Sequence, residues 1–317
     1  MSDAQRDCVT WAARQLRQAE PDTPIVTTLV KRRAWSTVWK LDTPQGRFYL
    51  KKAAPGFDIE APLLAALCCW RPAAIVELLA VDAARGWVLT RGAGRLLHDV
   101  MFDDYAKGQA HLRSILLAYA ELQADSRCGD APSFMDMLED RSPTAMSRSF
   151  AAVVEDEALL RIGGVTVDEL DRRSRWIRNV EHMCADAAAL NLPVTLEHGD
   201  LHTSNIMVAP DGTPRIADWG DACLALPLHS LVQCLDDIVG RHKIAPDDPW
   251  LILLTEDYFD VWRRRGYDID FHRALAIVRA LTPVSGVLQW SRGIDRMDTD
   301  ARTIMAGQIV KRLRALA

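Results

Sequence analysis

Residues 197–205 read Glu-His-Gly-Asp-Leu-His-Thr-Ser-Asn, and residues 218–221 read Asp-Trp-Gly-Asp. The first stretch lies between short apolar runs at 194–196 and 206–208, and the second follows a run at 215–217. Both are therefore predicted to be loops joined to strands. Strands hold the side chains of such loops in exposed, well-defined positions, where function concentrates. Polar groups crowded into a loop also need partners, such as a metal ion, a ligand or each other.

The residue types in these loops suit phosphoryl transfer, which depends mainly on positioning and charge neutralisation. Asp200 can accept the proton of an attacking group. Asn205, five residues later, and Asp218 offer the oxygen ligands that Mg²⁺ prefers. Such a reaction also needs a lysine on the phosphates and a carboxylate that orients it. The N-terminal part of the chain offers Lys51 at the end of a predicted strand and Glu60 in the helix that follows.

The chain before residue 92 predicts a sheet with one internal helix. Strand-like apolar runs occur at 25–30, 34–41, 47–51, 75–81 and 87–90. The turn at 42–46 favours an antiparallel hairpin. The internal helix is predicted from Asp58, which is expected to be its N-cap, to Trp70.

Beyond Gly92 and Gly94 the pattern becomes helical. Apolar residues recur on one face of a predicted helix at 103–124, and further helical patterns occupy 168–190 and most of 224–317. We therefore expect two domains: a β-rich lobe at 1–92 and a larger helical lobe at 93–317.

Composition excludes several classes of protein. The 317 residues are 49% hydrophobic and 26% charged, a globular balance that argues against a disordered chain. A net charge of −5 argues against binding duplex nucleic acid, which requires a basic face. No apolar run approaches the roughly 20 residues that span a bilayer, and the charged N-terminus does not resemble a signal peptide. We expect a soluble cytoplasmic protein with no membrane partner.

The chain has seven cysteines, at positions 8, 68, 69, 128, 184, 223 and 234. The number is odd, and no pair has the two-residue gap of a zinc knuckle or redox motif. Buried free thiols are the expected state, because cysteine packs like a small hydrophobic residue.

Taken in order, the motifs resemble those of the aminoglycoside phosphotransferase and choline kinase-like family. These are small-molecule kinases with the protein-kinase fold. Residues 198–205 are similar to the family's catalytic loop, and Ile-Ala-Asp-Trp-Gly-Asp at 216–221 is similar to its metal motif. Phe-Tyr-Leu-Lys at 48–51 resembles the strand that carries the ATP lysine, and residues 60–64 resemble the start of its partner helix. Residues 87–94 are similar to the hinge between the two lobes.

The resemblance implies a fold and a set of catalytic residues. The fold would be α+β and bilobal, with nucleotide binding in the N-terminal lobe and the catalytic and metal loops and acceptor site in the helical lobe. Asp200 would be the catalytic base, and Asn205 and Asp218 would bind Mg²⁺. Lys51 would contact the phosphates and be held by Glu60.

The resemblance also implies the substrates. ATP would donate its γ-phosphate, with Mg²⁺ as the metal, to a hydroxyl of a small molecule: an aminoglycoside-like compound, an amino alcohol or a sugar. Thr90 and Gly92 would lie near the adenine. Ser36 and Thr37 would lie in the turn that covers the phosphates.

Two features depart from the family pattern. The expected phosphate-covering turn, at 33–37, contains no glycine, so hydroxyl and backbone N–H groups would have to replace it. His229 stands where related proteins commonly have an aspartate with a structural function, which bears on stability more than on catalysis.

Other interpretations of these residues remain open. Lys52 competes with Lys51, although strand alternation would send the two to opposite faces. His198 and His202 are spaced for a zinc site on a helix, but Gly199 between them favours a loop in which His198 makes bracing hydrogen bonds. A nucleotide-binding regulatory module without transferase activity is the alternative function.

The distribution of charge along the chain bears on the acceptor. A polycationic acceptor needs carboxylates, and the stretch at 236–260 is rich in aspartate and glutamate. Acidic helix faces are also common where no ligand binds. Beyond this stretch the chain becomes basic, which favours a neutral or anionic acceptor.

Overall fold

A computed structural model describes residues 3–18, 21–126 and 133–316. Packing groups the chain into two units. The sheet unit comprises Met1–His111 with Ser204–Gly220, and the helical unit comprises Leu112–Thr203 with Asp221–Ala317. This grouping differs from the boundary expected at residue 92, which stays a prediction. Each unit is described by itself.

The sheet unit is built on five antiparallel strands in the order β1-β2-β3-β5-β4. Their bounds agree closely with the apolar runs in the sequence: β1 (Val26–Arg32), β2 (Ser36–Thr43), β3 (Gly46–Ala53), β4 (Leu78–Asp82) and β5 (Trp87–Arg91). The register pairs Lys51 with Val38 on one side and Val88 on the other.

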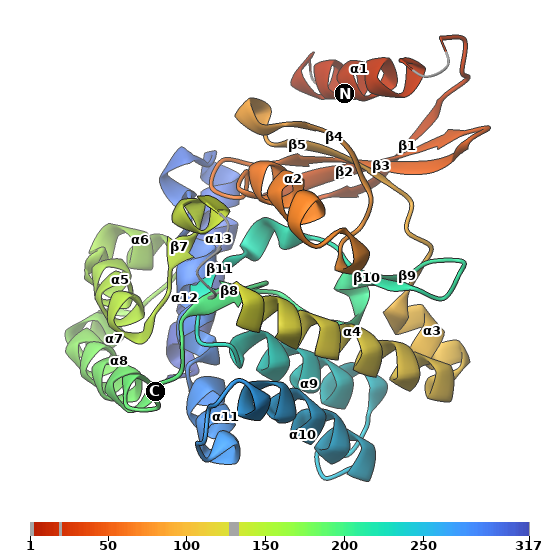
Figure 1. Ribbon diagram of the computed structural model, residues 1–317. Coiled ribbons are helices and arrows are strands. Elements are labelled where there is room, and N and C mark those ends of the chain that lie inside the picture. The colour runs from red at the N-terminus through yellow and green to blue at the C-terminus, as the bar shows by residue number, and fades with distance from the viewer. Residues whose placement is uncertain (1–2, 19–20, 127–132, 317) are drawn as a thin grey trace. The chain divides into compact units, whose positions relative to one another are not determined.

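Helix α1 (Asp3–Arg17) covers one face of this sheet (Figure 1). The core there contains Cys8 and Ala12 from the helix and alternate strand residues such as Trp39, Leu41 and Leu50. Successive side chains of a strand point to opposite faces. Lys51, next to Leu50, therefore points away from α1.

Smaller elements complete the sheet unit. Helix α2 (Glu60–Trp70) contacts β4 and β5. A second sheet, in the order β10-β9-β6, joins β6 (Arg95–Leu96), β9 (Ile206–Val208) and β10 (Pro214–Ile216), and α3 (Leu97–Asp103) packs on β9. Ile75 forms a bridge with Ile216, which joins the second sheet to the segment between α2 and β4.

The helical unit contains most of α4 (Tyr105–Asp125) and a three-stranded sheet in the order β7-β11-β8. The strands are β7 (Glu139–Asp140), β8 (Thr195–Glu197) and β11 (Cys223–Ala225). Its other α-helices are α5 (Pro143–Glu155), α6 (Glu157–Ile162), α7 (Val167–Asp171), α8 (Arg173–Ala188), α9 (His229–His242), α10 (Pro249–Arg264), α11 (Phe271–Ala280), α12 (Thr282–Ser291) and α13 (Thr299–Arg314). The predicted α+β class, with a sheet in the N-terminal region and a mostly helical remainder, is confirmed.

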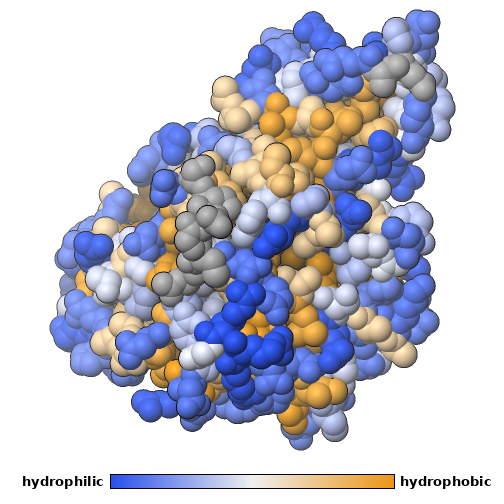
Figure 2. All heavy atoms as spheres, viewed as in Figure 1, coloured by the Kyte–Doolittle hydropathy of each residue, from blue (hydrophilic) through white to orange (hydrophobic). Residues whose placement is uncertain are grey.

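Polar side chains dominate the face seen in Figure 2, with smaller apolar patches between them. In residues 3–18, 21–126 and 133–316, no helix has both the length and the apolar composition that crossing a bilayer requires.

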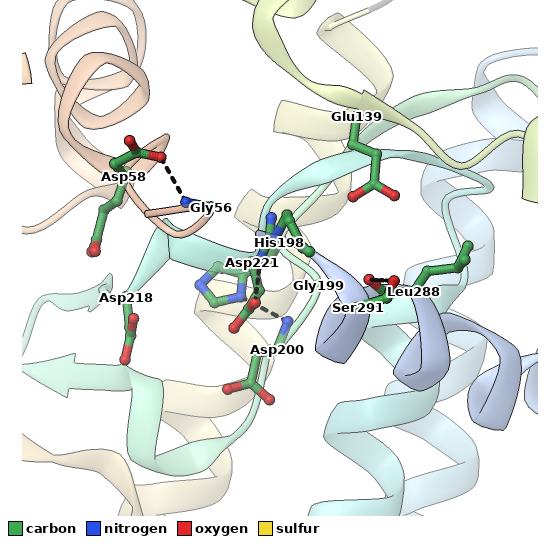
Figure 3. Close-up of polar contacts among 12 residues, drawn as sticks. Gly56, Asp58, Glu139, His198, Gly199, Asp200, Asp218, Asp221, Leu288 and Ser291 are labelled. Atoms are coloured by element: carbon green, nitrogen blue, oxygen red, sulfur yellow. Dashed lines mark hydrogen bonds and ion pairs between the residues drawn. The ribbon is translucent and has the colours of Figure 1, made fainter. Parts of the chain in front are cut away.

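One local prediction is wrong. Asp58 is not the N-cap of α2: Ile59 occupies that position without a side-chain hydrogen bond. The Asp58 carboxylate instead accepts a hydrogen bond from the backbone N–H of Gly56, at 3.2 Å, within the preceding turn (Figure 3). The helix expected at 103–124 is present as α4, which begins two residues later, at Tyr105, because α3 ends at Asp103.

The six cysteines in the described residues are free, as expected, but not all of them are buried. Cys8, Cys184, Cys223 and Cys234 are buried, whereas Cys68 is partly exposed and Cys69 exposed. The expectation of burial is therefore wrong for Cys69, because only part of the surface of α2 is covered. Cys128 lies outside the described residues.

Gly94 is predicted to be essential for the second sheet. Its φ is +97°, and a Cβ there would overlap the backbone of Val208 and Ala209. Gly94→Ala should lower the free energy of unfolding by about 2–4 kcal/mol, because overpacking adds to backbone strain. Gly240→Ala in α9 is the control, since a Cβ there meets nothing within 4 Å and should stabilise by up to about 1 kcal/mol. Equal urea midpoints for the two variants would contradict the prediction.

Candidate functional site

A partly buried lysine, its side chain 18% exposed, lies between two carboxylates in the sheet unit. Lys51 Nζ is 2.5 Å from Glu60 Oε2 and also pairs with Asp218 Oδ1. The Glu60 side chain is only 5% exposed. Burial opposes the charge of Lys51, but Asp218 and then Glu60 outweigh it and raise the pKa of Lys51 above its usual range. Lys51 is therefore a fixed cation, and the expected pairing with Glu60 is present.

A cavity of about 530 Å³ opens beside this lysine, within the same unit. Its apolar walls include Val38 and Val88 from the main sheet, Met207 from β9, and Ala217, which follows β10. A mostly apolar cavity with a few convergent charged groups is typical of a small-molecule site.

Tyr49 also lines this cavity, two residues before Lys51 on β3. The sequence analysis missed it. The two-residue spacing was the available signal, because residues i and i+2 of a strand share a face. Thr90, opposite Tyr49 in the sheet, lines the cavity as well.

The other residues expected near the nucleotide do not line the cavity. Ser36 begins β2, and its carbonyl accepts a hydrogen bond from Arg33 N–H at 2.8 Å. Thr37 pairs with Arg32 and Lys52 in the sheet. Gly92 N–H donates to the carbonyl of Arg47 at 2.7 Å. Their contact with a nucleotide stays a prediction.

Asn205 and Asp218 flank the open end of the β9–β10 hairpin. Ile206 pairs with Ile216, and Ala217 N–H donates to the Asn205 carbonyl at 2.8 Å. Asp218 has a φ of +64°, in the left-handed region that few residues other than glycine adopt. Backbone strain of this kind concentrates at functional sites.

The donor atoms at this hairpin end fit Mg²⁺. One carboxylate and one amide oxygen suit a hard cation that keeps several water or phosphate ligands. In the described part of the chain, no three His, Cys, Asp or Glu side chains form a metal site by themselves. An ion held here would therefore complete its coordination with phosphate and water oxygens.

The loop before Asp200 belongs to the helical unit and is fixed by hydrogen bonds. His198 is buried, its Nδ1 accepts from Asp200 N–H at 3.2 Å (Figure 3), and its own N–H donates to Tyr119 Oη at 2.8 Å. Gly199 has a φ of +78°, and a Cβ there would overlap the backbone of Asp221. The predicted bracing function of His198 is confirmed. The Asp200 side chain is 41% exposed and lies 3.5 Å from His202 Nε2.

Two residues of α9 hold this loop by hydrogen bonds, and neither was predicted to contact it. Gln233 donates to the Gly199 carbonyl at 2.6 Å and accepts from Leu201 N–H at 3.2 Å. Asp237 accepts from Thr203 twice, from N–H at 3.0 Å and from Oγ1 at 2.6 Å. Residues four apart share a helix face. Two polar residues at that spacing in an otherwise apolar pattern were the available signal.

Most acidic residues at 236–260 have partners within the helical unit. Arginine side chains pair with Asp236, Asp237, Glu256, Asp257 and Asp260 at 2.6–3.2 Å. Asp248 caps α10. These contacts remove the basis for interpreting the stretch as a lining for a polycationic acceptor.

Glu197 is completely buried directly before the loop. Its carboxylate accepts hydrogen bonds from Ser230 N–H at 3.0 Å, Gln123 Nε2 at 2.7 Å and Tyr119 Oη at 3.2 Å, and also from the Ser230 hydroxyl. Burial raises the pKa of Glu197 to about 7, although the hydrogen bonds from Ser230, Gln123 and Tyr119 oppose this effect.

His229, at the start of α9, is buried and neutral. Burial, with a smaller contribution from Arg141, lowers its pKa to about 4. Its Nδ1 lies 3.5 Å from Ser285 Oγ on α12. The residue that replaces the family's aspartate thus packs between helices, which agrees with a structural function.

Comparisons with known proteins agree with this geometry. The model of a family described as the phosphotransferase enzyme family matches residues 28–267. Among curated proteins, none matches this sequence.

Solved structures share the fold. The ethanolamine kinase of Plasmodium vivax has a TM-score of 0.63 at 10% identity, over 92% of this chain and 84% of that one. A choline/ethanolamine kinase family protein from Mesorhizobium loti has a TM-score of 0.59 at 17% identity, and the match covers 98% of this chain and 94% of that one. Aminoglycoside phosphotransferase APH(3'')-Id from Streptomyces rimosus, in complex with ADP and streptomycin, has a TM-score of 0.53 at 18% identity. That match covers 87% of this chain and 98% of the other.

Glu197 should make stability depend on pH. The pKa of its carboxyl group is about 7 in the folded protein, against an ordinary value of 4.5. Its contribution to the free energy of unfolding is therefore fully present below pH 4.5 and is lost as the pH rises to 7. At about 1.4 kcal/mol per pKa unit, the loss is roughly 3 kcal/mol. The free energy of unfolding of wild type relative to Glu197→Gln should therefore fall by that amount between pH 4.5 and 7.5, as measured by urea denaturation. Glu181→Gln, on the exposed side of α8, is the control, and parallel curves for wild type and Glu197→Gln would refute the prediction.

Proposed function

The chain belongs to the phosphotransferase enzyme family, and on this premise we propose that it transfers the γ-phosphate of Mg-ATP to a hydroxyl group of a small molecule. The observation that carries the proposal is Lys51, a partly buried cation held by Glu60 and Asp218 at the wall of a cavity. A similar solved structure contains ADP, which supports a nucleotide as the donor.

The cavity suits a nucleotide along its length. A purine ring would lie between Tyr49, Val38 and Val88, where apolar and aromatic surface replaces water. Its phosphates would extend to Lys51, whose fixed charge neutralises them. Asn205 and Asp218 would hold Mg²⁺, which, when bound, withdraws charge from the phosphate oxygens.

Asp200 would act on the acceptor. Its exposed carboxylate takes the hydroxyl proton while the hydroxyl oxygen forms a bond to the γ-phosphorus and the bond to the leaving ADP breaks. The hydrogen bonds between the loop backbone and the side chains of Gln233 and Asp237 would hold this carboxylate in position. Such positioning supplies much of the rate enhancement in phosphoryl transfer.

Replacing Asp200 tests the transfer step. Asp200→Asn should lower kcat by at least about 10²-fold, the usual scale for a general base, and leave the Kd for ATP unchanged. Labelled γ-phosphate is followed from Mg-ATP to pooled aminoglycosides, amino alcohols, sugars and nucleosides. Asp260→Asn, an exposed carboxylate on α10, is the control. Nucleotide binding without transfer to any acceptor by wild type would instead favour the regulatory module.

Replacing Asp218 and Lys51 tests the donor site. Asp218→Asn should raise the Kd for ATP about tenfold or more in the presence of Mg²⁺ and much less in its absence, because it removes a metal ligand. Lys51→Met should weaken nucleotide binding with or without the metal. Lys52→Met is the matched control, since this neighbour lies on the other face of the strand. Titration calorimetry measures all three, and equal effects of Lys51→Met and Lys52→Met would count against the assignment.

A further inference from the structure

One half-buried arginine of the helical unit has no carboxylate partner. Arg312, on α13, donates to the carbonyl of Gln308 at 3.2 Å and to its Oε1 at 3.0 Å, and its guanidinium lies 5.4 Å from the centre of the Trp290 ring. In the described part of the chain, no carboxylate oxygen is within 4.0 Å of it. Two other arginines of this unit are paired, Arg141 with Glu139 at 2.8 Å and Arg292 with Asp221 at 2.6 Å.

The position of Arg312 is built into the helix packing. Its side chain crosses α12 at Gly286, where a Cβ would overlap the Nε and Cδ atoms of Arg312. The glycine and the Trp290 ring thus hold the guanidinium in one place, which an exposed surface arginine does not require.

This place adjoins the Asp200 loop. Arg292, at the end of α12, pairs with Asp221, whose backbone lies against Gly199. Trp290 belongs to the last turn of α12 (Thr282–Ser291), so the guanidinium over its ring lies at the end of the helix that Arg292 joins to Asp221. Arg312 interacts electrostatically with Asp200, while burial lowers the pKa of the arginine.

A guanidinium that is partly removed from water and has no carboxylate at ion-pair distance can bind an anion. Arginine is the side chain best suited to this, because its planar donors match carboxylate and phosphate oxygens. An ammonium group at the same place would be repelled.

We propose that the acceptor is an anionic alcohol, whose carboxylate or phosphate group pairs with Arg312 while its hydroxyl lies at Asp200. The inference rests on the proposed function and narrows it, since it excludes choline-like and aminoglycoside-like acceptors. The acceptor is a small molecule, because one molecule has to reach Arg312 with its anionic group and Asp200 with its hydroxyl.

The first experiment measures anion binding. D-glycerate and glycerol 3-phosphate, which present the two anion types, are titrated into the protein saturated with Mg²⁺ and a non-hydrolysable ATP analogue; glycerol and choline are the uncharged and cationic probes. At least one anion should bind, and Arg312→Gln should weaken it about tenfold or more. Arg312→Lys should retain part of the affinity. Arg314→Gln, on the same helix but paired with Glu169, is the matched control. No binding by either anion, or binding unaffected by Arg312→Gln, would overturn the inference.

The second experiment measures transfer from Mg-ATP to the same compounds, with ethanolamine and kanamycin added. Anionic acceptors should exceed their uncharged and cationic counterparts by at least 100-fold in kcat/KM, and Arg312→Gln should raise KM more than it lowers kcat. Transfer to cationic or neutral acceptors alone would leave the proposed function standing and refute this inference. An equal loss with every acceptor would place Arg312 on the transferred phosphate and refute it too. Anion binding without any transfer would count against the proposed function and retain the anion site.

Discussion

The charge of Lys51 is the constraint on which the sheet unit depends. The partly buried ammonium of Lys51 pairs with both Glu60 and Asp218. The three residues come from β3, α2 and the segment after β10. A slip of β3 by one residue would turn Lys51 into the apolar core under α1. The strand register, the start of α2 and the end of the β9–β10 hairpin are therefore fixed by one ion-pair network.

The sequence predicts the parts of this arrangement that are local. The strands of the main sheet are predicted by the alternation of apolar and polar residues. The two loops are predicted by consecutive polar residues between apolar runs. Contacts between distant segments are harder to predict. Gln233 and Asp237 reach the Asp200 loop only because α9 packs behind it, and Asp58 is used by a turn that local propensity does not distinguish from a cap. The strands β7 and β11 are too short to show a period.

Most charged side chains of the helical unit that bear on the acceptor have partners within the unit. Its acidic residues at 236–260 are taken by arginines, by the Thr203 contacts and by the α10 cap, so their abundance in the sequence says little about a ligand. Arg312 differs from the paired arginines because no carboxylate lies at ion-pair distance in the described part of the chain, and sequence patterns do not reveal such a difference. Charge composition therefore predicts the acceptor less well than the distribution of paired and unpaired groups around Asp200.

The two contacts between α9 and the Asp200 loop also couple the loop to the position of that helix. Gln233 and Asp237 are one turn apart on a rigid element, so a rotation or shift of α9 moves the loop backbone at both points together. Helix α11 contacts α9. A change of packing at that contact would therefore also shift the backbone beside Asp200, and the surface of α11 is mechanically connected to the loop that the proposed transfer uses.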